Sequence, residues 1–154
     1  MNLPWLPWPL LLLVHLLGAV LWVGGMAFAH FALRPAAAEV LEPPQRLPLL
    51  AATLGRFFRL VGVAVPLILL TGLALLGRVG LATAPPAWHA MLALGLVMAG
   101  IFAFIVTVPY PRLKRHVAAR EWPAAGAAMA VIRRWVGVNL VLGTLTLVAA
   151  VWGR

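Results

Sequence analysis

Two histidines lie inside apolar stretches of this sequence, where ionisable side chains are costly and tend to be functional. His15 opens the segment HLLGAVLWVGG, and His89 stands at the start of another long apolar run. If the first segment is a helix, Gly18, Trp22 and Gly25 lie on the same face as the imidazole. This face carries one ligand-type side chain, one large ring and two positions without a side chain. We therefore predict a metal or cofactor site, with the glycines making room for a bulky group.

A second pair of donors follows in the first apolar run, where Met26 and His30 are four residues apart. Residues at this spacing share a helix face, and a thioether with an imidazole suits Cu(I). Methionine in an apolar helix more often fills the core, which is the alternative interpretation. Asn139 is the amide inside the last apolar run, and we expect it to bond to a neighbouring helix or to a ligand. The chain has no cysteine, so thiolate metal sites, iron–sulfur clusters and disulfides are excluded.

The composition defines the class of protein that must position these side chains. Hydrophobic residues make up 64% of the 154 residues and charged residues 10%, which is more apolar surface than a soluble domain of this size can bury. Runs of roughly 20 apolar residues can cross a hydrocarbon core about 30 Å thick. Four such runs lie at about 9–31, 57–77, 88–108 and 135–152. The sequence predicts an all-α fold, an integral membrane four-helix bundle forming a single transmembrane domain over residues 1–154.

The distribution of positive charge predicts the orientation of this bundle. Of the twelve Lys and Arg residues, ten lie between the first and second runs, at the start of the second run, or between the third and fourth runs. By the positive-inside rule both of these long connecting segments are cytoplasmic, and both termini lie on the opposite side of the membrane. The formal net charge of +9 then reflects orientation and contact with anionic lipid, so we expect the lipid bilayer as a partner and no nucleic acid.

An internal repeat relates the two halves of the chain. Residues 59–63 read Arg-Leu-Val-Gly-Val and residues 134–138, 75 positions later, read Arg-Trp-Val-Gly-Val, while His15 and His89 are 74 positions apart. We predict two tandem helical hairpins related as a parallel repeat, about an axis along the membrane normal. With neighbouring helix axes about 8–10 Å apart, the two histidines would lie at similar depth on diagonal helices roughly 12–14 Å apart.

That separation suits a metal shared with other ligands, or a haem iron between two axial imidazoles. The alternative is that each histidine only bonds a backbone carbonyl at the membrane interface.

Short motifs in all four runs together resemble the membrane domain of the CopD (copper-resistance protein D) family. They are the 15–25 segment HLLGAVLWVGG, the Leu33-Arg34-Pro35 exit of the first run, the Leu-Thr-Gly end of the second, the Trp-His opening of the third and the 132–147 segment IRRWVGVNLVLGTLTL. The resemblance covers nearly the whole chain. It implies a role in moving copper across the inner membrane or in tolerating copper, with the copper ion as the bound species.

The same skeleton also resembles the HemJ-type protoporphyrinogen oxidases, which are small four-helix membrane proteins that bind haem. In that family too, a histidine opens the first helix with a tryptophan seven residues on, as His15 and Trp22 do here. The resemblance implies haem b with His15 and His89 as axial ligands. Where that family carries His-Ala-Lys, this chain has His89-Ala90-Met91, and the missing lysine puts the oxidase reaction in doubt.

Three functions from different classes follow. We favour a CopD-like membrane protein that handles copper, in transport or resistance, through a His-based intramembrane site. The alternative is a haem b protein, either an electron carrier or a relative of the oxidase, and the third is a structural membrane subunit. The candidate metal ligands are His15, His89, Met26 and His30, and the candidate cofactor contacts are His15, His89, Gly18, Trp22, Gly25 and Asn139.

Enzymatic activity is the less favoured class. The sequence contains no Ser-His-Asp triad, phosphate-binding loop or pair of carboxylates that would support hydrolase or nucleotide chemistry. A homo-oligomer, or a periplasmic partner that exchanges metal or electrons, is compatible with the first two functions.

Overall fold

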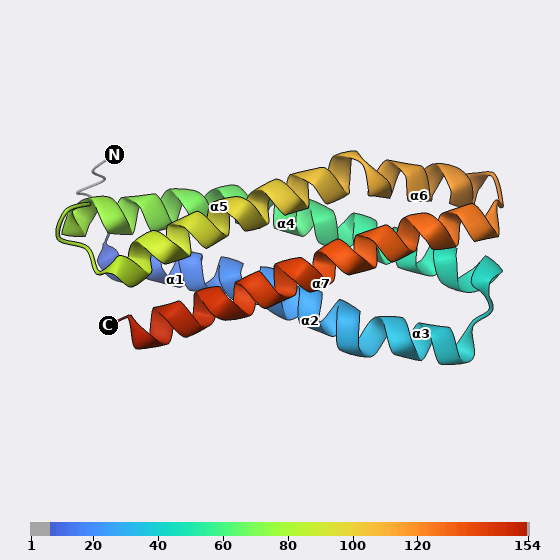
Figure 1. Cartoon of the computed structure of the whole chain (residues 1–154), viewed down its shortest axis with the longest axis horizontal. Helices are drawn as coiled ribbons and strands as arrows, with labels where there is room; N and C mark the ends of the chain where they lie inside the picture. Colours follow the sequence, from blue (N-terminus) through green and yellow to red (C-terminus); the bar gives the residue numbers. More distant parts are fainter. Residues whose placement is uncertain (1–6, 154) are drawn as a thin grey trace.

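The computed structural model of the chain describes residues 7–153. Within this range four helices are long and apolar enough to cross a membrane: Trp8–Val40, Pro43–Val79, Pro86–Ala118 and Trp122–Trp152. They run along the long axis of the molecule (Figure 1). The predicted all-α membrane four-helix bundle is confirmed, and each predicted apolar run lies inside one of these helices.

The first membrane helix changes its winding along its length. It consists of α1 (Trp8–Ala19), the π-helical segment η1 (Val20–Gly24), α2 (Gly25–Phe28), the π-helical segment η2 (Ala29–Leu33) and α3 (Arg34–Val40). The second π-helical segment ends two residues before Pro35, which has no N–H to donate in a regular α-helix. The helix therefore continues past residue 31, where the apolar run ends.

The second membrane helix, α4 (Pro43–Val79), is 37 residues long. It begins at the Pro43-Pro44 pair, because proline is tolerated in the first turn, where its missing N–H has no helical partner. Leu41 and Glu42 before it are extended, as expected for residues that precede prolines. The long connecting segment expected between the first two runs is thus helical almost throughout.

The third and fourth membrane helices are joined by a tight turn. α5 (Pro86–Thr107) and α6 (Pro109–Ala118) follow each other with a break at Val108, and α7 (Trp122–Trp152) is one helix of 31 residues. Arg120 in the turn has a φ of 57°, and the N–H of Glu121 donates to the carbonyl of His116. This bond, together with that from the N–H of Arg120 to the carbonyl of Val117, closes the end of α6 in a Schellman motif. The expected connecting segment before residue 135 is therefore part of α7.

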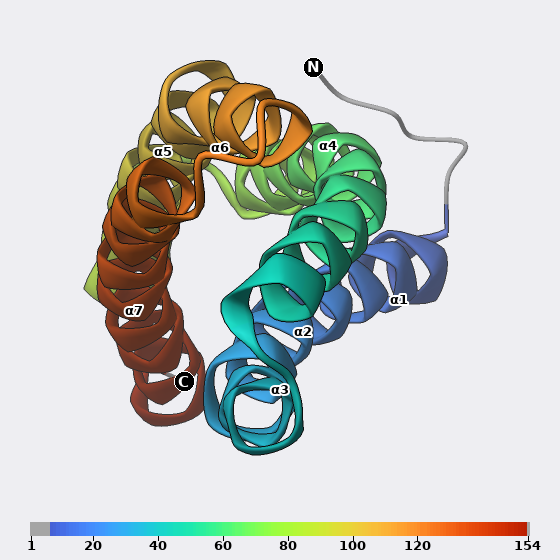
Figure 2. The same ribbon diagram turned by 90° about the vertical axis from the view of Figure 1, so that its right-hand side faces the viewer.

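The four helices form two hairpins. α1 packs along α4, and α7 packs along α5 and α6. In the end-on view the helices surround a common interior, with α4 beside α6 and α7 beside α2, while the contacts of α7 with the first helix also include η1 and η2 (Figure 2). The turns at 41–42 and 119–121 lie at one end of the molecule, while the 80–85 turn, the start of α1 and the end of α7 lie at the other (Figure 1).

Aromatic side chains from both hairpins meet in the interior. Trp22 is 4% exposed and contacts Phe102 edge to face, with ring centroids 6.2 Å apart. Phe58 lies between Phe102 and Tyr110, at 5.9 and 5.1 Å from their ring centroids. The outer faces of the helices expose many large apolar side chains, such as Val20. Exposed apolar faces of this extent are typical of contact with lipid.

Candidate functional site

His15 points from α1 toward α4. Its Nδ1 lies 3.0 Å from the backbone oxygen of Ile68 and 3.1 Å from Oγ1 of Thr71. The hydroxyl of Thr71 donates its own hydrogen to the backbone oxygen of Leu67, at 2.6 Å. Since a carbonyl oxygen can only accept, Nδ1 carries the hydrogen of the neutral imidazole and Nε2 carries the lone pair. A histidine that binds a metal is commonly oriented in this way, by a hydrogen bond from its other nitrogen to a carbonyl.

Gly72 makes room for this imidazole. A Cβ atom added to Gly72 would lie 3.1 Å from Cε1 of His15 and 3.5 Å from Nδ1. The first distance is tighter than an ordinary van der Waals contact. The Thr71-Gly72 pair of α4 therefore positions the ring, one residue through its hydroxyl and the other by leaving space.

The two glycines on the His15 face pack against α4. A Cβ atom on Gly18 would come within 2.6 Å of Cγ1 of Ile68, and a Cβ atom on Gly25 would clash with the ring of Phe57. Trp22, between them, is buried in the interior against Phe102. The space that the sequence assigned to a cofactor ring is therefore filled by side chains of α4, and these glycines allow close helix contact.

His89 has a different environment. It is exposed at the start of α5, and its Nε2 lies 3.1 Å from the backbone oxygen of Leu81, while its Nδ1 lies 3.4 Å from that of Pro85. Both carbonyls belong to the turn between α4 and α5. The hydrogen bonds of His15 and His89 thus go to different elements. His89 bonds to backbone carbonyls, which is the alternative interpretation given for the histidines in the sequence analysis.

Met26 and His30 also lie in different surroundings, although they share one helix. Met26 is 2% exposed and belongs to the main hydrophobic core. His30 lines a pocket of about 700 Å³ at the cation-rich end of the bundle, together with Arg34, Arg133 and Arg134. Within residues 7–153, no cluster of three or more His, Asp or Glu side chains could hold a metal ion. A metal inside the described bundle would therefore need thioether or amide donors beside an imidazole.

Asn139 supplies a buried amide in the interior. It is 1% exposed, and its Nδ2 donates to the backbone oxygen of Met98 at 3.3 Å. Its Oδ1 is buried and has no hydrogen-bond partner among the described residues. The expected bond to a neighbouring helix is present, while the orphaned oxygen is the kind of group that a water or a bound ion can satisfy.

The sequence did not indicate the partners of these side chains. The Thr146 hydroxyl donates to the backbone oxygen of Leu142 at 2.9 Å and lies 4.0 Å from Sδ of Met98, on the same side of α7 as Asn139. Asn139 and Thr146 are seven residues apart, and this spacing puts two polar side chains on one face of an apolar helix. The spacing is the feature of the sequence that could have indicated a polar contact here. Thr71 carries no comparable signal, because its role depends on a contact with α1 across 56 residues.

The fold and these side chains define a multi-pass membrane protein with polar groups held inside an apolar helix bundle. The family model described as copper resistance protein D matches residues 51–153, and the chain belongs to this CopD family. The family's description connects the chain with copper resistance. No curated protein and no solved structure matches the chain. The HemJ likeness thus remains a resemblance in a few residues.

Proposed function

We propose that this CopD-family protein handles copper at the membrane, in transport or resistance, and that the copper ion is its cargo. The observation that carries the proposal is the orientation of His15, whose Nδ1 is held by Ile68 and Thr71 so that the lone pair of Nε2 can bind a metal. An imidazole held in this way inside an apolar bundle is preorganised as a ligand.

The other donors fit a soft, monovalent copper ion. Cu(I) accepts imidazole and thioether ligands, and both kinds of donor occur along the first helix. Met26 lies 11 residues after His15, about 16 Å further along the helix axis, and His30 lies one turn beyond it. His89 stands near the opposite end, at the start of α5. We propose these residues as successive contacts for copper, with the orphaned oxygen of Asn139 as an interior polar contact.

The haem b function has no observation of this kind in its favour. Side chains of α4 fill the space beside Gly18 and Gly25, and His89 bonds to its own turn. If the copper content and copper tolerance of cells do not depend on His15, a structural subunit is the function that remains. We further propose that the chain is one transmembrane domain in a bacterial inner membrane, with both termini periplasmic, because the cations gather at one end of the bundle.

The test is the copper content and copper tolerance of bacterial cells that express the full chain. We expect expression to change both quantities, and His15→Ala to return them to the values of cells without the protein. His116→Ala is the matched control, because this histidine lies at the end of α6 and pairs with Glu121 at 2.6 Å. Equal effects of wild type and His15→Ala, at equal amounts of protein in the membrane, would contradict the proposal.

A further inference from the structure

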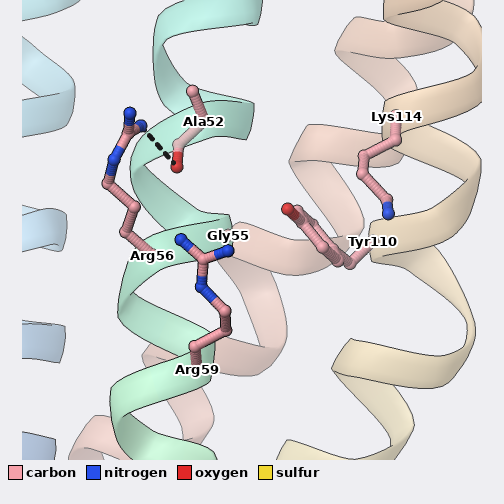
Figure 3. Close-up of a pocket in the computed structure, with 6 residues that line it drawn as sticks. All are labelled: Ala52, Gly55, Arg56, Arg59, Tyr110 and Lys114. Atoms are coloured by element: carbon pink, nitrogen blue, oxygen red, sulfur yellow. Dashed lines mark hydrogen bonds between the residues drawn. The ribbon is translucent and has the colours of Figure 1, made fainter.

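A basic pocket lies between the second and third membrane helices. It has a volume of about 410 Å³ and is lined by Arg56 and Arg59 of α4 and by Tyr110 and Lys114 of α6. Tyr110 points toward α4, with its hydroxyl donating to the backbone oxygen of Ala51 at 3.3 Å (Figure 3). Nζ of Lys114 lies 5.2 Å from the Tyr110 ring centroid. The pocket is thus lined by three cations and one aromatic ring.

A second basic pocket lies between the fourth and first membrane helices. It has a volume of about 700 Å³ and is lined by Arg133 and Arg134 of α7 and by His30 and Arg34 of the first helix. Each pocket therefore joins the two hairpins, and each contains a ring with a cation four residues later on the same helix.

The internal repeat relates these two pockets. Arg59 and Arg134 are the first residues of the two repeated Arg-x-Val-Gly-Val blocks, and each lines one of the pockets. If each hairpin is superposed on the other, the boundary between the second and third helices coincides with the boundary between the fourth and first helices. The repeat therefore relates the pockets through these two arginines, whereas Tyr110 and His30 are 80 positions apart and do not correspond in it.

Both pockets lie at the ends of the apolar runs, where a helix that crosses a membrane meets the lipid headgroups. Arg59 and Arg134 stand within three residues of the starts of the second and fourth apolar runs, while His30 and Tyr110 lie within two residues of the ends of the first and third. One turn deeper, Val63 and Val138 are 63% and 40% exposed. Each arginine therefore has an apolar contact surface next to it on the membrane side.

No acidic side chain balances these cations. The acidic residues of the chain are Glu39, Glu42 and Glu121, and none of them lines either pocket. Arg34 is close enough to Arg133 and Arg46 for their charges to repel its guanidinium. An anion in either pocket would reduce this repulsion between like charges.

We propose that the two pockets bind the phosphate groups of anionic phospholipids, one lipid in each pocket. Guanidinium groups bind phosphate oxygens with directed hydrogen bonds, and basic pockets between membrane helices are suited to anionic headgroups. The acyl chains would lie along the exposed valines one turn deeper. These lipids would bridge the two hairpins at the cation-rich end.

The test is native mass spectrometry of the full chain, purified in detergent and supplied with phosphatidylglycerol or with phosphatidylcholine. Wild type should retain up to two molecules of phosphatidylglycerol and should gain thermal stability from it, but not from phosphatidylcholine. Arg59→Gln and Arg134→Gln should each weaken one site about fivefold, and the double variant should weaken both. Arg59→Lys and Arg134→Lys keep the charge and should retain most of the binding.

Arg112→Gln is the matched control, since Arg112 is an exposed cation of α6 at the same end of the molecule and outside both pockets. It should retain both lipids. Equal retention of phosphatidylcholine by wild type, or unchanged retention of phosphatidylglycerol by the double variant, would overturn the proposal. Displacement of the lipid by inorganic phosphate would assign the pockets to a free anion and would also overturn it.

Discussion

Thr71 and Gly72 determine what the His15 imidazole can do. Because the ring donates from Nδ1, any ligand role falls to Nε2, and the other tautomer would place the lone pair of Nδ1 against the carbonyl oxygen of Ile68. Asn139 shows the opposite situation, since its amide donates and its carbonyl oxygen is left without a partner. Both groups keep an unused acceptor, and the imidazole nitrogen of His15 is the donor type that suits copper.

Gly18 provides a test of helix packing at a single position. Gly18→Leu should lower the free energy of unfolding by about 1–3 kcal/mol, because its Cβ would already meet Ile68. Gly24→Leu is the control, since a Cβ at Gly24 has no atom within 4 Å and a better helix former should be neutral or slightly stabilising there. Thermal unfolding in detergent measures both. Equal stability of the two variants would show that Gly18 faces open space.

The sequence predicts the position of His15 but not the atoms that orient it. Histidine in an apolar run is visible in the sequence, whereas its bond to Thr71 joins positions 56 residues apart. The sequence places Gly18 and Gly25 on one helix face and predicts that something bulky lies against this face. A single helix pattern does not distinguish a cofactor ring from the Ile68 and Phe57 side chains that lie there.

The helices extend well beyond the apolar runs that predict them. α4 is 37 residues long, about 55 Å, whereas a hydrocarbon core is about 30 Å thick. Hydropathy marks only the part of a helix that lies in lipid. The remainder is polar or Ala-rich, and it is helical because packing of α6 against α7 buries side chains such as Leu113 and Ala125. Such tertiary contacts are absent from a hydropathy pattern.

The orientation of the helices is testable with reporter fusions. A reporter inserted in the 41–42 or 119–121 turn should report the cytoplasm, and one attached after the C-terminus should report the periplasm. The reason is that ten of the twelve Lys and Arg residues lie toward the end of the bundle that carries those two turns. A C-terminal reporter active in the cytoplasm would reverse the orientation and would place the start of α1, with His15, near the inner face.

The whole molecule is a pair of hairpins whose contacts differ in kind at different levels. Toward one end of the molecule, His15 lies between α1 and α4. In the middle, aromatic side chains such as Trp22 and Tyr110 join the two hairpins. At the other end, the two basic pockets lie between the hairpins. The duplication was visible in the Arg-x-Val-Gly-Val blocks of the sequence. That each block lines a pocket at a hairpin boundary required the three-dimensional arrangement.

X-ray absorption at the copper K-edge tests the central claim most directly. The measurement uses purified full-length protein loaded with Cu(I), compared with His15→Ala and with Thr71→Val, which removes an acceptor of the Nδ1 hydrogen. We predict imidazole nitrogen scattering that His15→Ala reduces, and a copper affinity that falls about tenfold in Thr71→Val, as for other residues that orient a metal ligand. An unchanged spectrum and an unchanged copper content in His15→Ala would contradict the account.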